Sequence, residues 1–142
     1  MSKSNALETD LLALLFNATA IANIADNAAS APLTSLYLAL HTADPGEAGT
    51  QSTSEVSYTN YARKAVARSG SGFTVSGNQV VLAANQDFPE SASAGGTATW
   101  GSVGVASSGA TKILYRFALN NSIACTSGVA PRLTTGTTIT ED

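Results

Sequence analysis

The hydrophobic pattern of the chain changes its period at Pro32, and this change limits the folds that the chain can adopt. Apolar residues before Pro32 recur at the spacing of one helix face: Leu7, Leu11, Leu14, Leu15, Ala18, Ala22 and Ala25. After Pro32, leucine alternates with other residues in "SLYLALHT", which is typical of a strand. The sequence therefore predicts a helical arm over residues 1–31 and a β-domain over residues 32–142.

The predicted helix over Leu7 to Ala25 is unusually apolar. Asn5 and Glu8 have the spacing of a capping box at its start. Additional apolar residues widen its stripe, so that the helix must be covered on most sides. One small β-domain covers only one side, and a neighbouring subunit could cover the other. The residues predicted to make this interface are Leu7, Leu11, Leu12, Leu15 and Phe16.

The rest of the chain reads as short strands with turn signals between them. "GFTVSGNQVVLA" predicts a hairpin that turns at Ser76-Gly77-Asn78, and "ATWGSVGV" and "TKILYRFAL" predict an antiparallel pair. "VSYTNYARKAVAR" predicts one bent strand or two. Because strands and helices do not alternate, an antiparallel sandwich, a jelly roll or a small barrel is favoured. The predicted class is mainly β: an antiparallel, jelly-roll-like β-sandwich with an N-terminal α-helix.

The composition limits the partners of the chain. A net charge of −3 argues against nucleic-acid binding, which needs a basic face. The apolar run "LLALLF" is too short to cross a bilayer, and the N-terminus lacks a basic region typical of a secretory signal, so no membrane partner is expected. Charged residues make up only 12% of the chain, which indicates either a surface covered by partners or a stable β-domain with a hydroxyl-rich exterior.

The chain offers little for chemistry. His41 is the only histidine and Cys125 the only cysteine, so a zinc site has too few ligands. Asp44, Glu47 and Glu55 could bind calcium through oxygen, but they lack EF-hand spacing, and a solvated acidic turn is preferred. We expect no enzyme activity, no catalytic residue, no metal and no cofactor, and we expect His41 and Asp44 to shape the strand-to-loop turn.

One group of basic residues could contact a partner. Arg63, Lys64 and Arg68 lie close in sequence to Tyr58 and Tyr61. Arginine and tyrosine are enriched among the residues that anchor protein interfaces. The group is therefore a second predicted interface, and ordinary surface charge is the alternative.

Several motifs together resemble small virion structural proteins of tailed bacteriophages, which are often described as tail-fibre-like. The motifs are the L-Y-L-A-L-H-T-A-D-P-G run at Leu36 to Gly46, Y-x-x-Y-A-R at Tyr58 to Arg63, Trp100-Gly101, and the terminal hairpin from Gly128 to Thr140. The resemblance covers most of the chain after Pro32, and the His-Thr-Ala-Asp-Pro-Gly run is its most specific part. It implies a place in the virion and no catalytic residues.

The position of the chain in the particle then depends on its architecture. A projecting fibre usually shows repeats or coiled-coil periodicity, and this sequence has neither. We therefore expect a capsid cement or decoration protein on the capsid exterior, assembled in the host cytoplasm. Its partners would be the major capsid protein and its own copies, as a dimer or trimer. The alternative is a tail-fibre or tail-tip module that binds a host surface.

Overall fold

A computed structural model describes residues 3–21, 23–25 and 31–141. The chain divides into two compact units, each built from segments that are distant in sequence. The first unit comprises Met1–Ser35, Val66–Ala84 and Thr134–Asp142. The second unit comprises Leu36–Ala65 and Asn85–Leu133. No helix in the described ranges has the length and apolar character needed to span a membrane.

The N-cap of helix α1 (Asn5–Asn17) lies one residue before the predicted cap. Ser4 is the N-cap, and its side chain accepts a hydrogen bond of 3.4 Å from the Leu7 amide. Asn5 is therefore the first helical residue, and the predicted capping box at Asn5 and Glu8 is wrong, because the residue three positions after the Ser4 cap is Leu7. The error is small because serine and asparagine cap helices equally well.

The helix ends at Asn17, well before Ala25, so the predicted helix is too long. Ala18 adopts the left-handed conformation with φ of 55°, and the Thr19 amide donates back to the Ala13 carbonyl at 3.1 Å. This bond satisfies a carbonyl near the end of the helix that would otherwise lack a hydrogen-bond donor within the helix. Ala25 pairs with Ile21 in an isolated bridge, and Ala22 lies outside the described residues.

Replacing Ala18 with glycine should stabilise the chain. In the left-handed conformation the Cβ of alanine costs about 1–2 kcal/mol, and glycine removes this cost. Glycine also makes the unfolded chain more flexible, which lowers stability by about 0.4–1 kcal/mol. We therefore expect the free energy of unfolding to rise by roughly 0.5–1 kcal/mol. Urea unfolding monitored by circular dichroism measures it. The control Ala13→Gly, inside α1, should lose about 1 kcal/mol. A loss of similar size in Ala18→Gly would contradict the assigned helix end.

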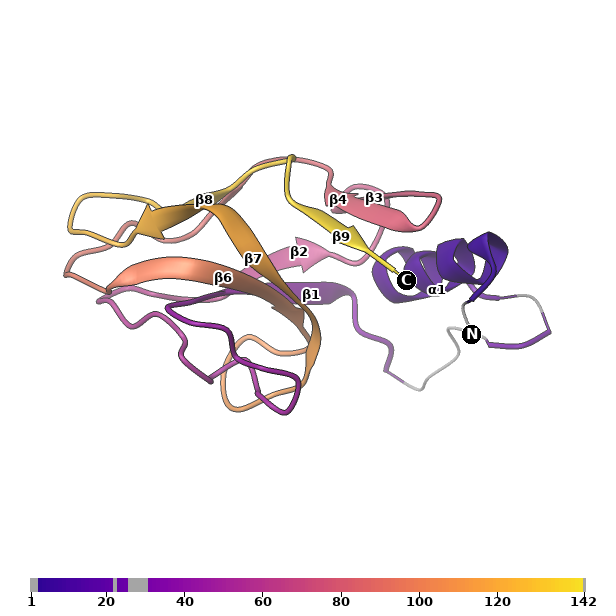
Figure 1. Cartoon of the computed structure of the whole chain (residues 1–142), viewed down its shortest axis with the longest axis horizontal. Coiled ribbons are helices and arrows are strands. Elements are labelled where there is room, and N and C mark those ends of the chain that lie inside the picture. Colours follow the sequence, from indigo (N-terminus) through magenta and orange to yellow (C-terminus); the bar gives the residue numbers. More distant parts are fainter. Residues whose placement is uncertain (1–2, 22, 26–30, 142) are drawn as a thin grey trace. The chain divides into compact units, whose positions relative to one another are not determined.

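The first unit packs α1 on a three-stranded antiparallel sheet. The sheet has the order β3 (Phe73–Ser76), β4 (Gln79–Leu82) and β9 (Thr138–Thr140). Helix α1 lies beside β3 and β4 (Figure 1). Phe16 of α1 meets Phe73 edge to face, with ring centroids 4.9 Å apart, and Leu12 is fully buried. The helix thus belongs to a β-unit and is not a separate arm.

The predicted hairpin in the first unit is confirmed. Phe73 pairs with Leu82 and Ser76 with Gln79, so the loop contains only two residues. Gly77 occupies the first loop position with φ of 59°. Two-residue hairpins require such a conformation, which glycine adopts without strain.

The larger sheet has the order β2-β1-β6-β7. Its strands are β1 (Ser35–His41), β2 (Lys64–Ala67), β6 (Thr97–Gly104) and β7 (Ile113–Ala124). Strands β1, β6 and β7 pair antiparallel, as the sequence predicted for the last two. In the second unit, β5 (Gln86–Asp87) and β8 (Arg132–Leu133) form a further antiparallel pair. The predicted class, mainly β with antiparallel pairing and an N-terminal helix, is confirmed.

Strand β1 is buried on both faces. Leu36, Leu38 and Leu40 are at most 2% exposed, as predicted, but Ala39 and His41 on the other face are also fully buried. The loop that follows β1 covers the second face, where the Thr53 carbonyl bonds to the His41 side chain. His41 is therefore an interior residue.

The predicted strand over "VSYTNYARKAVAR" forms only at its end, in β2. Residues 56–63 are irregular, with a turn in which the Tyr61 amide donates to the Tyr58 carbonyl at 2.9 Å. Asn60 in this turn has φ of 78°. Alternation along a strand therefore does not decide where Arg63 points.

Candidate functional site

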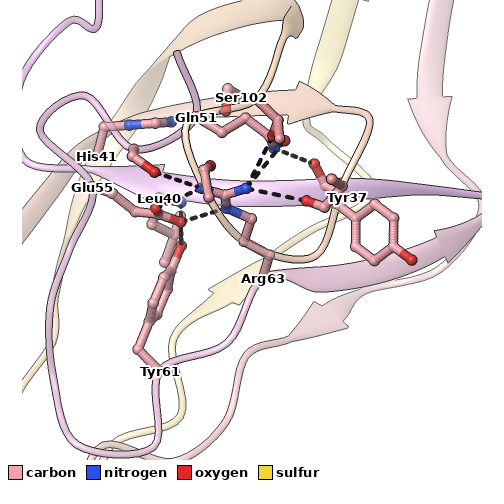
Figure 2. Close-up of polar contacts among 12 residues, drawn as sticks. Tyr37, Leu40, His41, Gln51, Glu55, Tyr61, Arg63 and Ser102 are labelled. Atoms are coloured by element: carbon pink, nitrogen blue, oxygen red, sulfur yellow. Dashed lines mark hydrogen bonds and ion pairs between the residues drawn. The ribbon is translucent and has the colours of Figure 1, made fainter.

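The most elaborate polar cluster in the second unit surrounds Arg63 (Figure 2). The guanidinium donates from Nε to Glu55 Oε1 at 2.7 Å and from Nη2 to Oε2 at 2.8 Å. The Arg63 side chain is 2% exposed and that of Glu55 16%. This paired geometry matches the fork of arginine to both carboxylate oxygens, and burial removes most competition from water.

The remaining Arg63 donors hold a second loop. They bond to the carbonyls of Ala106 and Gly109, at 3.2 and 2.8 Å, and to the Thr111 hydroxyl at 3.2 Å. These residues form the connection between β6 and β7. One buried side chain thus fixes both this connection and the loop that contains Glu55. The two are called the clamped loops below: residues 44–55 and 105–112.

Gln51 joins the clamped loops to the sheet. Its Nε2 donates to the Tyr37 carbonyl of β1 at 2.9 Å, and its Oε1 accepts from the Thr111 hydroxyl at 3.0 Å. The Gln51 side chain also fills the space above Gly104, where a Cβ would lie 2.0 Å from it. Gly104 is thus required for the close approach of the loop to β6.

Tyr61 completes the cluster on the other side of Glu55. Its hydroxyl donates to Glu55 Oε1 at 3.0 Å and accepts from the Leu40 amide at 3.1 Å. The ring stacks on Phe88 with centroids 6.2 Å apart. Burial, together with the Glu55 carboxylate, raises the pKa of Tyr61, so the hydroxyl remains a donor at any physiological pH.

His41 connects the end of β1 to the first clamped loop. Its Nδ1 lies 2.8 Å from the Thr53 carbonyl, and its Nε2 lies 2.8 Å from the Ser102 hydroxyl. Since a carbonyl only accepts, Nδ1 carries the proton, and neutral Nε2 accepts from Ser102. Burial lowers the pKa of His41 despite the nearby carboxylates of Glu55 and Asp44. The expected role of His41 in shaping the strand end is confirmed.

Burial of neutral His41 should make the chain less stable in mild acid. The unfolded chain takes up a proton at its ordinary pKa near 6.5 while the folded chain resists it, so stability falls as pH drops below that value. We expect the free energy of unfolding to decrease from pH 7 to pH 5 by more in the native chain than in His41→Gln. Urea titrations at both values measure it, and equal pH dependence in the two proteins would count against a neutral His41.

Asp44 organises the exposed part of the same loop. Its Oδ1 accepts from the Gly46 amide at 2.8 Å, and its carboxylate bonds to Arg116 of β7 at 2.7 Å. Arg116 also lies over the ring of Trp100, with 5.5 Å to the centroid. Asp44 therefore shapes the turn, as expected, and does so apart from His41.

The predicted basic interface separates into three environments. Arg63 and Tyr58 are buried in their own unit, at 7% and 6% exposure, so they are not the surface anchors that the sequence suggested. Tyr58 donates to the Pro89 carbonyl at 2.9 Å, and burial raises the pKa of its hydroxyl to about 12.

Arg68 and Lys64 lie in two other environments. Arg68 donates to the Leu15 and Leu14 carbonyls at 2.7 and 2.6 Å, where it satisfies the end of α1. Lys64 is half-buried.

The residues of α1 that were predicted to make an interface fall into a buried group and a partly exposed group. Leu12 and Phe16 are fully buried against their own unit, which corrects their assignment to an intermolecular contact. Leu7 is 38% exposed, and Leu11 and Leu15 are half-buried. An interface role for these three residues stays a prediction.

Sequence reasoning missed Gln51, Thr111 and Ser102 as members of the cluster. They are common polar residues in loops or strands, and each bonds to a member of the cluster that is at least 12 positions away in the sequence. The one signal in the sequence for such a cluster was that Glu55, Tyr58, Tyr61 and Arg63 lie within nine positions of one another.

The cluster is suited to holding loops in place. Its arginine, carboxylate and hydroxyls bond to one another, and within the described ranges no buried polar side-chain atom lacks a partner. The same ranges contain no group of three histidine, cysteine or acidic side chains placed to hold a metal. Cys125 is fully buried, and burial raises the pKa of its thiol.

Comparison with known proteins identifies the family. The family model described as podophage GP4 fiber I protein gp80 matches residues 2–141. No curated protein matches the chain at a significant level. The match confirms the resemblance to bacteriophage structural proteins, although it names a fibre protein and not the group defined by the His-Thr-Ala-Asp-Pro-Gly run. The chain belongs to the podophage fibre family of gp80 and is a structural protein of a bacteriophage virion.

Proposed function

We propose that this chain is a component of the virion fibre that works by binding other virion proteins. The observation that carries the proposal is the family match over residues 2–141, which names a podophage fibre protein. The alternative position that the sequence suggested, a tail fibre, is thereby preferred over the capsid exterior.

The polar cluster supports a structural role. Arg63 and Glu55 would be the strongest charged groups available for catalysis, but both are bonded to each other in the interior of the unit. A buried ion pair of this kind specifies a conformation more than it adds stability. The clamped loops are therefore held in fixed positions before any partner arrives, which reduces the entropy lost on binding.

The exposed apolar residues supply the other support. Ile24, Leu33 and Leu7 of the first unit are 79%, 44% and 38% exposed, and Val129 of the second unit is 41% exposed. Each of these side chains would leave water at a protein interface, and the burial of apolar surface favours association. With only 12% charged residues, the chain has few groups to oppose such contacts.

Immunogold electron microscopy of intact particles tests the proposal. Antibodies raised against the purified chain should label the fibres at the tail end of the particle. Pre-immune serum and particles from a phage that lacks the gene are the controls. Label spread evenly over the head would reject the fibre role, and particles without label would reject a place in the virion.

Capsid cement remains a second candidate because of one observation. In the described ranges, the longest helix has 13 residues and the longest strand 12, so these ranges contain no extended shaft. A cement protein would bind the major capsid protein and stabilise the head. Label on the head in the same experiment, with heads that lose their DNA at lower temperature when the gene is deleted, would favour it.

A further inference from the structure

Strand β7 forms one edge of the larger sheet, whose order is β2-β1-β6-β7. Backbone groups on such an edge that point away from the sheet can bind an extended segment of another chain. The pairing of β7 with β6 is regular over residues 115–118, and its register shifts on both sides of this stretch. These shifts limit the part of the edge that can accept a further strand to a short window. Residues 115–118 are called the open edge below.

The hydrogen bonds of β1 establish the backbone direction in its neighbour β6. The Leu40 carbonyl accepts from the Val56 amide at 3.0 Å, and the Leu40 amide donates to the Tyr61 hydroxyl at 3.1 Å. Both groups of Leu40 therefore point away from β6. Gly101 lies opposite Leu40, so it directs its own N–H and C=O groups away from β1 and toward β7.

The same alternation places two residues of the open edge with their backbone groups outward. Gly101 pairs with Phe117, whose N–H and C=O groups therefore point toward β6. The neighbours Arg116 and Ala118 then point theirs away from the sheet. Among the residues that the structure describes, none forms a hydrogen bond with these four outward groups. The open edge thus has two N–H donors and two C=O acceptors for an added strand.

The side chains of the open edge differ between the two faces of the sheet. Phe117 lies over Gly101, where a Cβ would be 2.5 Å from its ring, and it is half-buried. Arg116 lies on the other face, over the ring of Trp100. An added strand continues both faces, so its side chains should alternate between an apolar surface beside Phe117 and a polar surface beside Arg116.

The polar surface has an excess of negative charge. Arg116 pairs with Asp44 at 2.7 Å, and the Glu47 carboxylate lies 3.9 Å from the same guanidinium. The Glu47 side chain is 93% exposed. Arg116, Asp44 and Glu47 together carry one net negative charge, so a basic side chain in the added strand is favoured.

The same charges disfavour a second copy of the chain as the added strand. Two identical edges that pair antiparallel are related by a two-fold axis perpendicular to the sheet, which brings their polar surfaces to the same side. Asp44 and Glu47 of both copies would then lie near the axis with no additional cation. Like charges brought together in this way oppose association.

We propose that the open edge of β7 binds an extended segment of another virion protein as an added antiparallel strand. The segment has apolar side chains beside Phe117 and hydroxyl and basic side chains beside Arg116. The antiparallel direction follows the other pairs of this sheet and is the more stable per residue. The inference rests on the proposed role of the chain in binding other virion proteins, and it names the surface and the kind of partner.

Binding of a synthetic peptide tests this inference. The probe is the capped, fluorescently labelled peptide Lys-Val-Thr-Val-Thr-Val-Lys, and the anisotropy of the label is followed as the full-length chain is added. In an antiparallel pair, the bonding groups of the peptide belong to the residues on the polar face, which are lysine and threonine. N-methylation of both threonine amides removes two of these donors and should weaken binding by about tenfold or more.

A peptide N-methylated at its last two valines is the matched control. It has the same charge, composition and number of methyl groups, but its methylated amides point away from β7. Its affinity should stay within about twofold of that of the unmodified peptide, since no bond to the edge is lost. Non-specific attraction between a basic peptide and an acidic chain would not distinguish the two modified peptides.

Variants of the chain test the position of the edge. Ala118→Pro removes one outward N–H and no bond to β6, so it should keep the fold and weaken peptide binding by about fivefold or more. Ala118→Ser keeps the N–H and should bind like the native chain. Glu47→Gln removes the exposed charge and should weaken binding by about twofold to fivefold. Circular dichroism and thermal unfolding show whether each variant is folded, and the methylated peptides test the proposal on the native chain alone.

Each result either supports or overturns the proposed edge contact. Binding that is lost on threonine methylation and kept on valine methylation supports it. No binding to the native chain, or equal loss with both modified peptides, overturns it. Folded Ala118→Pro that binds like the native chain also overturns it. Immunogold label on the fibres without peptide binding would reject the open edge and leave the fibre role standing, whereas label on the head would reject the fibre role alone.

Discussion

Arg63→Ala should unfold the second unit under conditions in which the native chain is folded. The substitution leaves the buried Glu55 carboxylate without its partner and frees the carbonyls of Ala106 and Gly109. Removal of one member of a buried ion pair costs about 3–5 kcal/mol, which approaches the whole stability of a small domain. The free energy of unfolding, from urea titration followed by tryptophan fluorescence, measures the loss. Trp100 of β6 reports on this unit.

Two further variants show whether the geometry of the cluster matters. Arg63→Lys keeps the positive charge but cannot bond to both carboxylate oxygens and the second loop, so most of the loss should remain. Arg132→Ala breaks an exposed ion pair, in which the side chains of Arg132 and Asp87 are 54% and 50% exposed. This substitution should leave the unfolding midpoint nearly unchanged. If Arg63→Ala unfolded at the native midpoint, the cluster would not hold the fold.

Phe16→Ala should produce the largest loss in the first unit. The Phe16 ring is fully buried and meets Phe73 with centroids 4.9 Å apart. Truncation of a buried phenylalanine costs about 3–5 kcal/mol, because it removes apolar contact and leaves a cavity. The unfolding midpoint of α1, from far-ultraviolet circular dichroism, should fall accordingly.

Leu7→Ala, in the same helix, is the matched control. Leu7 is 38% exposed, so its truncation should cost well under about 1 kcal/mol in a single chain. The difference between the two variants measures how firmly α1 belongs to its own unit. Equal losses would mean that the inner face of the helix has been assigned wrongly.

Local patterns predicted the elements that depend on local physics. The alternation in "SLYLALHT" predicted β1, and the Ser76-Gly77-Asn78 turn signal predicted the β3–β4 hairpin. Helical spacing predicted α1 but not its end. Ala18 has no residue-type signal for a left-handed conformation, whereas glycine would have had one. Apolar residues also continue at helical spacing to Ala25, so periodicity alone does not predict that the helix ends at Asn17.

The Arg63 cluster could not be predicted in the same way. Arg63 lies next to β2, where an arginine on an alternating strand would be expected at a surface. Its partners come from loops up to 48 positions away, and only the folded chain brings them together. Its burial depends on Glu55 meeting it in a paired geometry, since an isolated arginine would remain in water. Four of the residues predicted at interfaces are therefore interior: Leu12, Phe16, Tyr58 and Arg63. An interface role for the partly exposed leucines of α1 stays a prediction.

A cryo-electron microscopy reconstruction of the intact virion at side-chain resolution tests the central claim most directly: that this chain is a fibre part which acts through protein contacts. The account predicts density for the chain in the fibre, in contact with other virion proteins and with Arg63 enclosed in its own unit. Density for the chain on the head surface, or a particle that contains no density for it, would contradict the account.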